Sequence, residues 1–246
     1  MPVALVQGAS RGLGLELARQ LLSEHDQVVA TCRDPGGAVE LLALAREAAG
    51  RLVVLPLDVE DEASIGEAAD AVRARTERLD VLMNVAGILH DGGLQPEKKL
   101  DRVDPRNLER VFAINAFGPL LVAKHFEPLL THGGRAVLAN LSARVGSIGD
   151  NRLGGWYAYR ASKAAQNMFT RNLAIELGRR NERLIVLALH PGTVDTGLSA
   201  PFQRSVPDER LFSTERAARQ LLRIVREATV EDTGAFFAWD GSTIPW

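Results

Sequence analysis

Residues 3–16, "VALVQGASRGLGLE", join a short β-branched apolar run to a glycine-rich turn and the start of a helical pattern. The glycines have the spacing Gly8-x3-Gly12-x-Gly14, directly after the apolar run. Glycines there let the backbone turn tightly and approach a phosphate, while the N-terminus of the next helix offers free N–H groups and a partial positive charge. The stretch therefore predicts the first βα unit of a dinucleotide-binding fold.

The same alternation of apolar runs and helical patterns continues along the chain. We expect strands at residues 3–6, 28–31, 52–57, 81–84, 136–141 and 184–189, with 236–239 as a candidate seventh. We expect helices at residues 13–24, 39–49, 62–75, 108–130, 157–179 and 214–228. This order predicts an α/β fold: a Rossmann-type, doubly wound parallel sheet of about seven strands with helices on both faces, in one domain over residues 1–246.

Composition narrows the function classes. The chain has 246 residues, 46% of them hydrophobic and 24% charged, and a net charge of −2 without a basic run. Nucleic acid and membrane are therefore poor candidates for partners. Cys32 is the single cysteine, which excludes an intrachain disulfide and a thiolate zinc cluster. We expect a cytoplasmic protein, because no signal-peptide pattern or membrane-length apolar run is present. We expect no metal site.

Residues 197–213 form the least regular stretch and contain Pro201 and Pro207. They follow an expected strand, and ligands of such sheets bind at the carboxyl ends of strands. The stretch is therefore a candidate substrate lid, although a plain surface loop fits the sequence equally well.

The end of the second expected strand bears on the choice of nicotinamide cofactor. An acidic residue there would bind the ribose hydroxyls of NAD. This chain has Cys32 at that position, followed by Arg33, and Arg11 lies in the glycine turn. Two guanidinium groups suit a ribose 2′-phosphate, which favours NADP(H) over NAD(H). In the alternative, Asp34 binds the ribose and Arg33 is solvated.

Two further strand ends fit a dinucleotide. Asp58 follows the third expected strand and could reach an adenine amino group or cap the next helix. The fourth strand ends in Asn84-Val85-Ala86-Gly87, whose small residues leave room for a cofactor across the strand ends.

The segment "YAYRASK", residues 157–163, contains a candidate acid–base pair. On a helix, Tyr159 and Lys163 share a face, whereas Tyr157 points elsewhere. A phenol has a pKa of about 10, and a nearby ammonium group favours its phenolate form. A solvated helix face is the alternative interpretation, and the neighbouring motifs favour the catalytic one. His190, Trp156 and Phe202 are less specific. We expect His190 to be structural; for the two aromatic residues, a place in the substrate pocket, core packing and exposed hydrophobicity fit the sequence equally well.

These motifs resemble the short-chain dehydrogenase/reductase family over nearly the whole chain. The resemblance rests on the glycine turn, Asn84-Val85-Ala86-Gly87, Asn115, Tyr159-x3-Lys163 and Pro191-Gly192-Thr193-Val194-Asp195-Thr196. Residues 143–165, "ARVGSIGDNRLGGWYAYRASKAA", and the terminal "DGSTIPW" are similar to the branch containing the C-factor and the sniffer-type carbonyl reductases.

The resemblance implies hydride transfer between NADP(H) and a small carbonyl or alcohol substrate, in a homodimer or homotetramer. It assigns general acid–base catalysis to Tyr159, assisted by Lys163, with Asn115 as the active-site amide. The cofactor-binding positions that it implies, together with those argued above, are Gly8, Ser10, Arg11, Gly12, Leu13, Gly14, Arg33, Asp58, Val59, Asn84, Ala86, Gly87, Tyr159, Lys163, Pro191, Gly192, Val194 and Thr196.

The chain departs from the family pattern at three places. Gln7 replaces a usual threonine, and Val85 replaces the second asparagine of its motif. The family's catalytic serine would fall on Ala143 without a gap. We choose Ser142, which can serve only if the strand end is irregular, because neighbouring strand residues point to opposite faces; Ser147 is a further candidate. These departures keep a second hypothesis open, a catalytically degenerate NADP(H)-binding sensor or signalling protein.

Overall fold

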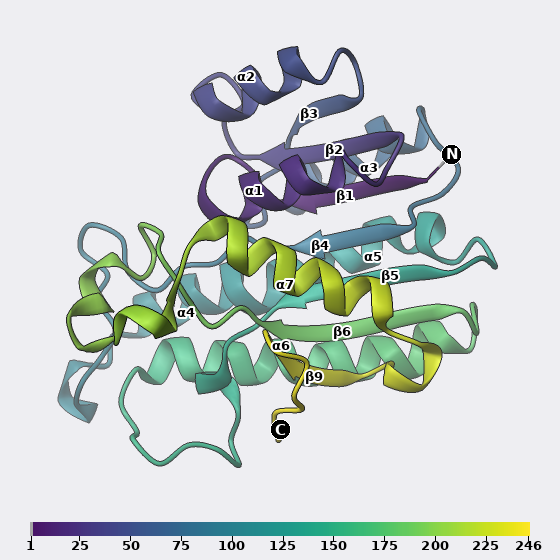
Figure 1. Ribbon diagram of the computed structural model, residues 1–246. Helices are drawn as coiled ribbons and strands as arrows, with labels where there is room; N and C mark the ends of the chain where they lie inside the picture. Colours follow the sequence, from purple (N-terminus) through teal and green to yellow (C-terminus); the bar gives the residue numbers. More distant parts are fainter. Residues whose placement is uncertain (1) are drawn as a thin grey trace.

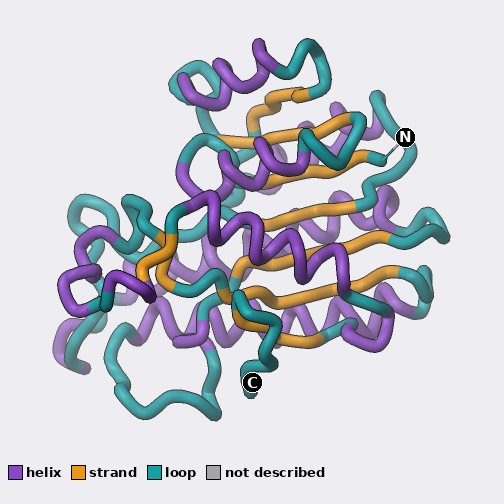
Figure 2. The backbone as a smooth tube through the Cα atoms, viewed as in Figure 1, coloured by secondary structure: helices purple, strands orange, loops and turns teal. Residues whose placement is uncertain are grey.

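Seven strands form one sheet in the order β3-β2-β1-β4-β5-β6-β9 (Figures 1 and 2). The computed structural model describes residues 2–246, apart from the side chain of Ser205. All neighbouring strands pair in parallel. The strands are β1 (Val3–Gln7), β2 (Gln27–Cys32), β3 (Leu52–Pro56), β4 (Val81–Asn84), β5 (Ala136–Leu141), β6 (Leu184–His190) and β9 (Ala235–Ala238). The predicted doubly wound sheet, including its seventh strand, is confirmed.

Helices cover both faces of this sheet, which explains why β1 is buried at every position and its sequence does not alternate. Helices α1 (Gly12–Leu21), α2 (Val39–Glu47) and α7 (Thr214–Glu227) contribute to the core on one face, and Figure 1 shows α1 and α7 in front of the sheet. Helices α3 (Glu62–Arg73), α4 (Pro105–Phe112), α5 (Gly118–Leu130) and α6 (Tyr157–Gly178) contribute to the core on the other face. Alternate strand residues serve the two cores: Val6 belongs to the first and Leu5 to the second.

The segment between β4 and β5 is not the uniform helix expected over residues 108–130. A π-helical turn, Ala113–Phe117, separates α4 from α5. Pro119 stands four residues after Asn115 and has no N–H group, so the Asn115 carbonyl lacks an α-helical donor. The Gly118 N–H instead donates to the Ala113 carbonyl, five residues back.

Residues 197–213 are more ordered than expected. They contain the short helices Ala200–Ser205 and Asp208–Arg210 and the strand β8 (Leu211–Phe212). Strand β8 pairs in parallel with β7 (Thr193–Val194), directly after β6. The segment is thereby folded back onto the carboxyl end of the sheet.

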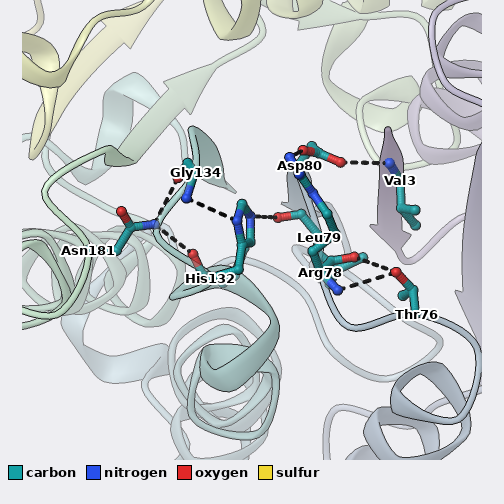
Figure 3. A network of polar contacts seen from close by, with 9 residues as sticks. Val3, Thr76, Arg78, Leu79, Asp80, His132, Gly134 and Asn181 are labelled. Carbon is teal, nitrogen blue, oxygen red and sulfur yellow. Dashed lines mark hydrogen bonds and ion pairs between the residues drawn. The ribbon is translucent and has the colours of Figure 1, made fainter. Parts of the chain in front are cut away.

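A polar network fixes the opposite, amino-terminal edge of the strands (Figure 3). The Val3 N–H donates to the Asp80 carboxylate over 2.7 Å. His132 is 3.1 Å from the Leu79 carbonyl through Nε2, and its Nδ1 accepts from the Gly134 N–H. Side-chain hydrogen bonds therefore fix the amino-terminal ends of these strands. The loops that form the candidate site lie at the opposite, carboxyl ends. Within residues 2–246, no helix combines the length and the apolar character needed to cross a membrane.

Candidate active site

The glycine turn lies against the end of β4. Gly8 has φ +87°, and a Cβ added to it would lie 2.6 Å from the Ala86 nitrogen. A Cβ added to Gly14 would lie 2.1 Å from the Gly8 carbonyl oxygen. Gln7, the first departure from the family pattern, accepts a hydrogen bond of 3.2 Å from the Ala86 N–H through its side chain. Only glycine fits these close approaches, so the glycines of the turn are required by its packing against β4 and α1.

The loop after β6 faces the same turn. A Cβ added to Gly12 would lie 3.4 Å from Thr196 Cγ2. Gly192 has φ +78°, and a Cβ there would meet the Phe212 ring at 2.6 Å. The structure thus brings together the two predicted cofactor-binding segments, one from each half of the sheet, as a dinucleotide that spans the carboxyl edge requires.

At the predicted ribose end, Arg11 and Arg33 are both exposed. Among the described residues, neither guanidinium group belongs to an ion pair. Asp34, the alternative ribose ligand, accepts a hydrogen bond of 3.2 Å from the Gly37 N–H in its own turn. The two arginines are thus available to a phosphate, while Asp34 keeps its second carboxylate oxygen available to a ribose hydroxyl.

Asp58 does not cap helix α3. Its carboxylate accepts from the Glu60 N–H over 3.0 Å, and the cap is Asp61, which accepts from the Ala63 N–H. The capping role is therefore wrong, and contact between Asp58 and the adenine stays a prediction. Val59 is buried beside Gly118, where an added Cβ would lie 2.7 Å from the Val59 Cβ.

The first two residues of the motif that ends β4 make different contacts: Asn84 makes a hydrogen bond, and Val85 packs against apolar side chains. Asn84 is buried and donates to the Asn140 side-chain oxygen over 2.8 Å. Val85, the second departure, packs against the apolar core on the α1 side of the sheet. Packing therefore replaces the polar contact that an asparagine would make there.

Asn115 is fully buried in the π-helical turn and joins three elements. Its side-chain oxygen accepts from the Ile88 N–H, and its Nδ2 donates to the Ile88 carbonyl, both over 2.8 Å. The same Nδ2 donates to Ser162 on α6 over 3.2 Å. The carboxamide thus fixes the chain after β4 against the helix that carries Tyr159.

Helix α6 separates the two tyrosines as predicted: Tyr159 is 8% exposed and Tyr157 is 41% exposed. Lys163 is buried one turn after Tyr159 and donates to the Leu141 carbonyl (2.7 Å) and the Gln166 side chain (3.0 Å). A Cβ added to Gly87 would lie 3.3 Å from Asn115 Oδ1 and 3.7 Å from Lys163 Nζ. Gly87 therefore marks the point where Asn115, Lys163 and the end of β4 meet.

Burial dominates the protonation of this pair. Desolvation raises the pKa of Tyr159 to about 12 and lowers the pKa of Lys163 to about 7. Both shifts favour the neutral form of a group removed from water. In the protein chain by itself, burial is thus the cause of the raised Tyr159 pKa, and the expected lowering by the lysine is not seen.

The candidate serines are both engaged elsewhere. Ser142 is buried and donates to the Asn167 side-chain oxygen on α6 over 2.6 Å. The Ser142 N–H donates to the Leu189 carbonyl (2.8 Å), so the ladder with β6 continues and the strand end is regular. Ser147 donates to the Pro245 carbonyl and accepts from the Asp150 N–H. Ala143 is half-buried and has extended backbone angles.

An aromatic cluster connects Tyr159 with the candidate lid. The Trp156 ring lies 6.2 Å from the Tyr159 ring and 5.0 Å from the Phe202 ring, measured between centroids. His90 packs edge-on against Phe202, and its Nε2 is 3.1 Å from the Gly197 carbonyl. Residues 197–213 therefore contact the side chain next to Tyr159.

Sequence reasoning missed His90 and Glu97, which lie in the loop after β4. Glu97 is buried and bonds to the first turn of α6. The sequence signal was a single acidic residue in a loop of mixed polar and apolar residues, which alone does not indicate burial. His190, the last residue of β6, is half-buried and paired with Ala238 of β9; desolvation first and Arg144 second lower its pKa to about 4, against the opposite effect of Asp240.

Comparison with known proteins agrees with this geometry. The model of the family described as short chain dehydrogenase matches residues 2–206. The C-signal protein of Myxococcus xanthus is 36% identical over 178 residues, covering 72% of this chain and 99% of that protein. The solved NADPH-bound carbonyl reductase from chicken fatty liver is 34% identical, with a TM-score of 0.88 and coverage of 100% of this chain and 98% of that one.

The carbonyl reductase Sniffer of D. melanogaster is 27% identical, with a TM-score of 0.87 and coverage of 100% of this chain and 99% of that one. These similarities confirm the resemblance to the C-factor and sniffer-type branch that the motifs predicted. The chain belongs to the short-chain dehydrogenase family.

Proposed function

We propose that this oxidoreductase transfers a hydride between NADP(H) and a small carbonyl or alcohol substrate, with Tyr159 as general acid–base. The observation that carries the proposal is the convergence of buried Tyr159, Lys163 and Asn115 at the edge of the sheet where the glycine turn meets the end of β4. The tight turn of Gly8, Gly12 and Gly14 at the N-terminus of α1 would let backbone N–H groups bind a pyrophosphate. Bound NADP(H) would supply or accept the hydride.

The residues of the chain would move the proton. With a pKa of about 12, Tyr159 is protonated at neutral pH, which suits donation of a proton to a carbonyl oxygen. Lys163 would hold the ribose and, when protonated, favour the phenolate that remains. The Asn115 carbonyl, which lacks an α-helical donor because of Pro119, would hold a water that returns the proton.

Arg11 and Arg33 would bind the 2′-phosphate and set a preference for NADP(H). Their exposure and their freedom from ion pairs among the described residues support this role. The relative from chicken liver was solved with NADPH, which also favours this cofactor.

Residues 197–213 would form the substrate lid. Phe202 and Trp156 give the entrance an aromatic wall next to Tyr159, so the substrate would carry an apolar or aromatic group beside its carbonyl. The outer face of α6 and of the π-helical turn before α5 would form a homodimer interface, since the apolar side chains of Phe117, Met168 and Ile175 are exposed there. The buried thiol of Cys32 is compatible with the proposed cytoplasmic location.

A second candidate is an NADP(H)-binding signalling protein without turnover. Three observations favour it: Ala143 at the position of the catalytic serine, the hydrogen bond that engages Ser142, and the similarity to a protein named C-signal. Its distinguishing result would be tight NADP(H) binding with no turnover over a broad panel of aldehydes, ketones and alcohols.

The deciding experiment compares Tyr159→Phe with Tyr157→Phe. NADPH and NADH consumption are followed with the carbonyl panel, and NADPH binding is measured by fluorescence. We expect Tyr159→Phe to bind NADPH but lose turnover by at least about a hundredfold, while the exposed Tyr157→Phe control keeps both. Normal turnover in Tyr159→Phe would refute the proposed role.

A further inference from the structure

The turn that precedes the catalytic helix has an unusual backbone. Gly154, Gly155 and Trp156 are three successive left-handed residues, with φ of +64°, +65° and +50°. Glycine adopts this conformation freely, whereas the Cβ of a tryptophan is crowded in it, so neighbouring structure must hold Trp156 in place. Trp156 is also the N-cap of α6 and makes no side-chain cap hydrogen bond.

Glu97 supplies the hydrogen-bond acceptors for the N–H groups at the start of α6. Its main-chain oxygen accepts from the Trp156 N–H over 2.5 Å. Its carboxylate accepts from the Ala158 N–H, the second of the helix, over 3.2 Å. A residue 61 positions earlier thus provides the cap that Trp156 does not.

The environment of Glu97 fits this role. The residue is only 4% exposed. No lysine, arginine or histidine among the described residues forms an ion pair with its carboxylate. The partial positive charge of the α6 N-terminus and the Ala158 N–H are what stabilise the buried oxygen atoms.

The capped turn lies next to the reacting phenol. Tyr159 follows Ala158 directly, and the Trp156 ring packs against the Tyr159 ring. The loop that carries Glu97 is fixed at its start by the bonds between Asn115 and Ile88. A shift of this turn by a fraction of an ångström would change where the phenol points, and catalysis is sensitive to such shifts.

We propose that Glu97 is a positioning residue: through the Ala158 N–H it fixes the first turn of α6 and so the direction of the Tyr159 hydroxyl. The proposal rests on the proposed role of Tyr159 as the acid–base group. It does not require Glu97 to touch substrate or cofactor.

The test uses the full chain with three variants. Glu97→Gln keeps an oxygen acceptor of the same size, and Glu97→Leu keeps most of the volume without an acceptor. Asp104→Ala is the matched control, because Asp104 also accepts from the N–H of the second residue of a helix, Arg106 in α4, over 2.9 Å. Turnover, KM for NADPH, thermal stability and amide hydrogen exchange over residues 156–160 are measured for each.

We expect Glu97→Leu to speed exchange at Ala158 by about fivefold and to lower kcat by roughly tenfold to a hundredfold, with KM for NADPH within about twofold. Glu97→Gln should stay near the parent in exchange and kcat. Asp104→Ala should lose thermal stability and keep kcat.

Three results would overturn the proposal: normal kcat in Glu97→Leu, an equal loss in Glu97→Gln, or an equal loss in Asp104→Ala. If the parent protein turns over no carbonyl, that result refutes the proposed reductase activity, independently of Glu97. The exchange measurement then still decides whether Glu97 fixes the first turn: unchanged exchange in Glu97→Leu overturns that step as well.

Discussion

The Ser142 hydroxyl donates to the Asn167 carboxamide over 2.6 Å, which directs the hydroxyl toward helix α6. Asn167 lies eight residues after Tyr159, about 12 Å along the helix axis. The Tyr159 side chain, like long side chains on helices in general, leans toward the N-terminus and so away from Asn167. We infer that Ser142 packs the strand against the helix and that Ala143 occupies the place of a catalytic hydroxyl.

The first prediction therefore compares Ser142→Ala with Ala143→Ser. Ser142→Ala should leave kcat/KM within about threefold and cost roughly 1 kcal/mol of folding free energy, because Asn167 loses its donor. Ala143→Ser should raise kcat/KM by about tenfold, since a second donor to the carbonyl oxygen stabilises developing charge. Carbonyl reduction rates and urea unfolding measure both effects; a large loss of turnover in Ser142→Ala would restore Ser142 as the catalytic serine.

The second prediction concerns Arg33. Replacing it by alanine should raise KM for NADPH by about tenfold or more, because a charge-assisted contact to phosphate is lost, and should leave KM for NADH within about twofold. The exposed Arg46 on α2 gives a matched control that should change neither constant. If the parent protein clearly prefers NADH, the role given to Arg11 and Arg33 is wrong.

Local patterns predicted most of the sheet and the convergence of the motif residues. The glycine spacing reflects close backbone approaches at Gly8 and Gly14, and the four-residue spacing of Tyr159 and Lys163 reflects one helical turn. The turn and the helical spacing depend on residues close together in the sequence. The convergence of the motifs follows from the rule that ligands bind at the carboxyl ends of parallel strands. The sequence alone therefore predicts both.

Contacts between distant segments could not be predicted in the same way. His90 bonds to carbonyls 107 and 108 residues away, and Glu97 bonds to an N–H 61 residues away. Their partners are backbone groups, which every residue carries, so no side-chain pattern marks them. The two-residue strands β7 and β8 are too short for a periodic signal, which is why residues 197–213 looked irregular.

The third prediction tests the π-helical turn at Asn115. Pro119→Ala returns an N–H that can bond to the Asn115 carbonyl and complete an α-helical turn. We expect kcat to fall by about tenfold, because the carbonyl no longer holds the water that returns the proton, without a loss of thermal stability. Pro128, the other proline inside α5, provides the control: Pro128→Ala should keep kcat. Unchanged turnover in Pro119→Ala would show that the carbonyl has no part in proton return.

The fourth prediction concerns Lys163 and the pH dependence of stability. Its pKa is about 7 in the folded protein against 10.5 for an ordinary lysine, so between these values the unfolded chain binds more protons than the folded one. Stability must then rise with pH across this window and fall as pH is lowered toward 7. From about pH 7.5 to 9.5 the lysine should add about 2 kcal/mol to the free energy of unfolding, because one pKa unit corresponds to about 1.4 kcal/mol. Lys163→Met cannot titrate and should lose this slope, while Lys124→Met, at an exposed lysine on α5, should keep it. Urea unfolding at the two pH values measures the difference, and an equal slope in Lys163→Met and the parent protein would show that the buried ammonium group is not the cause.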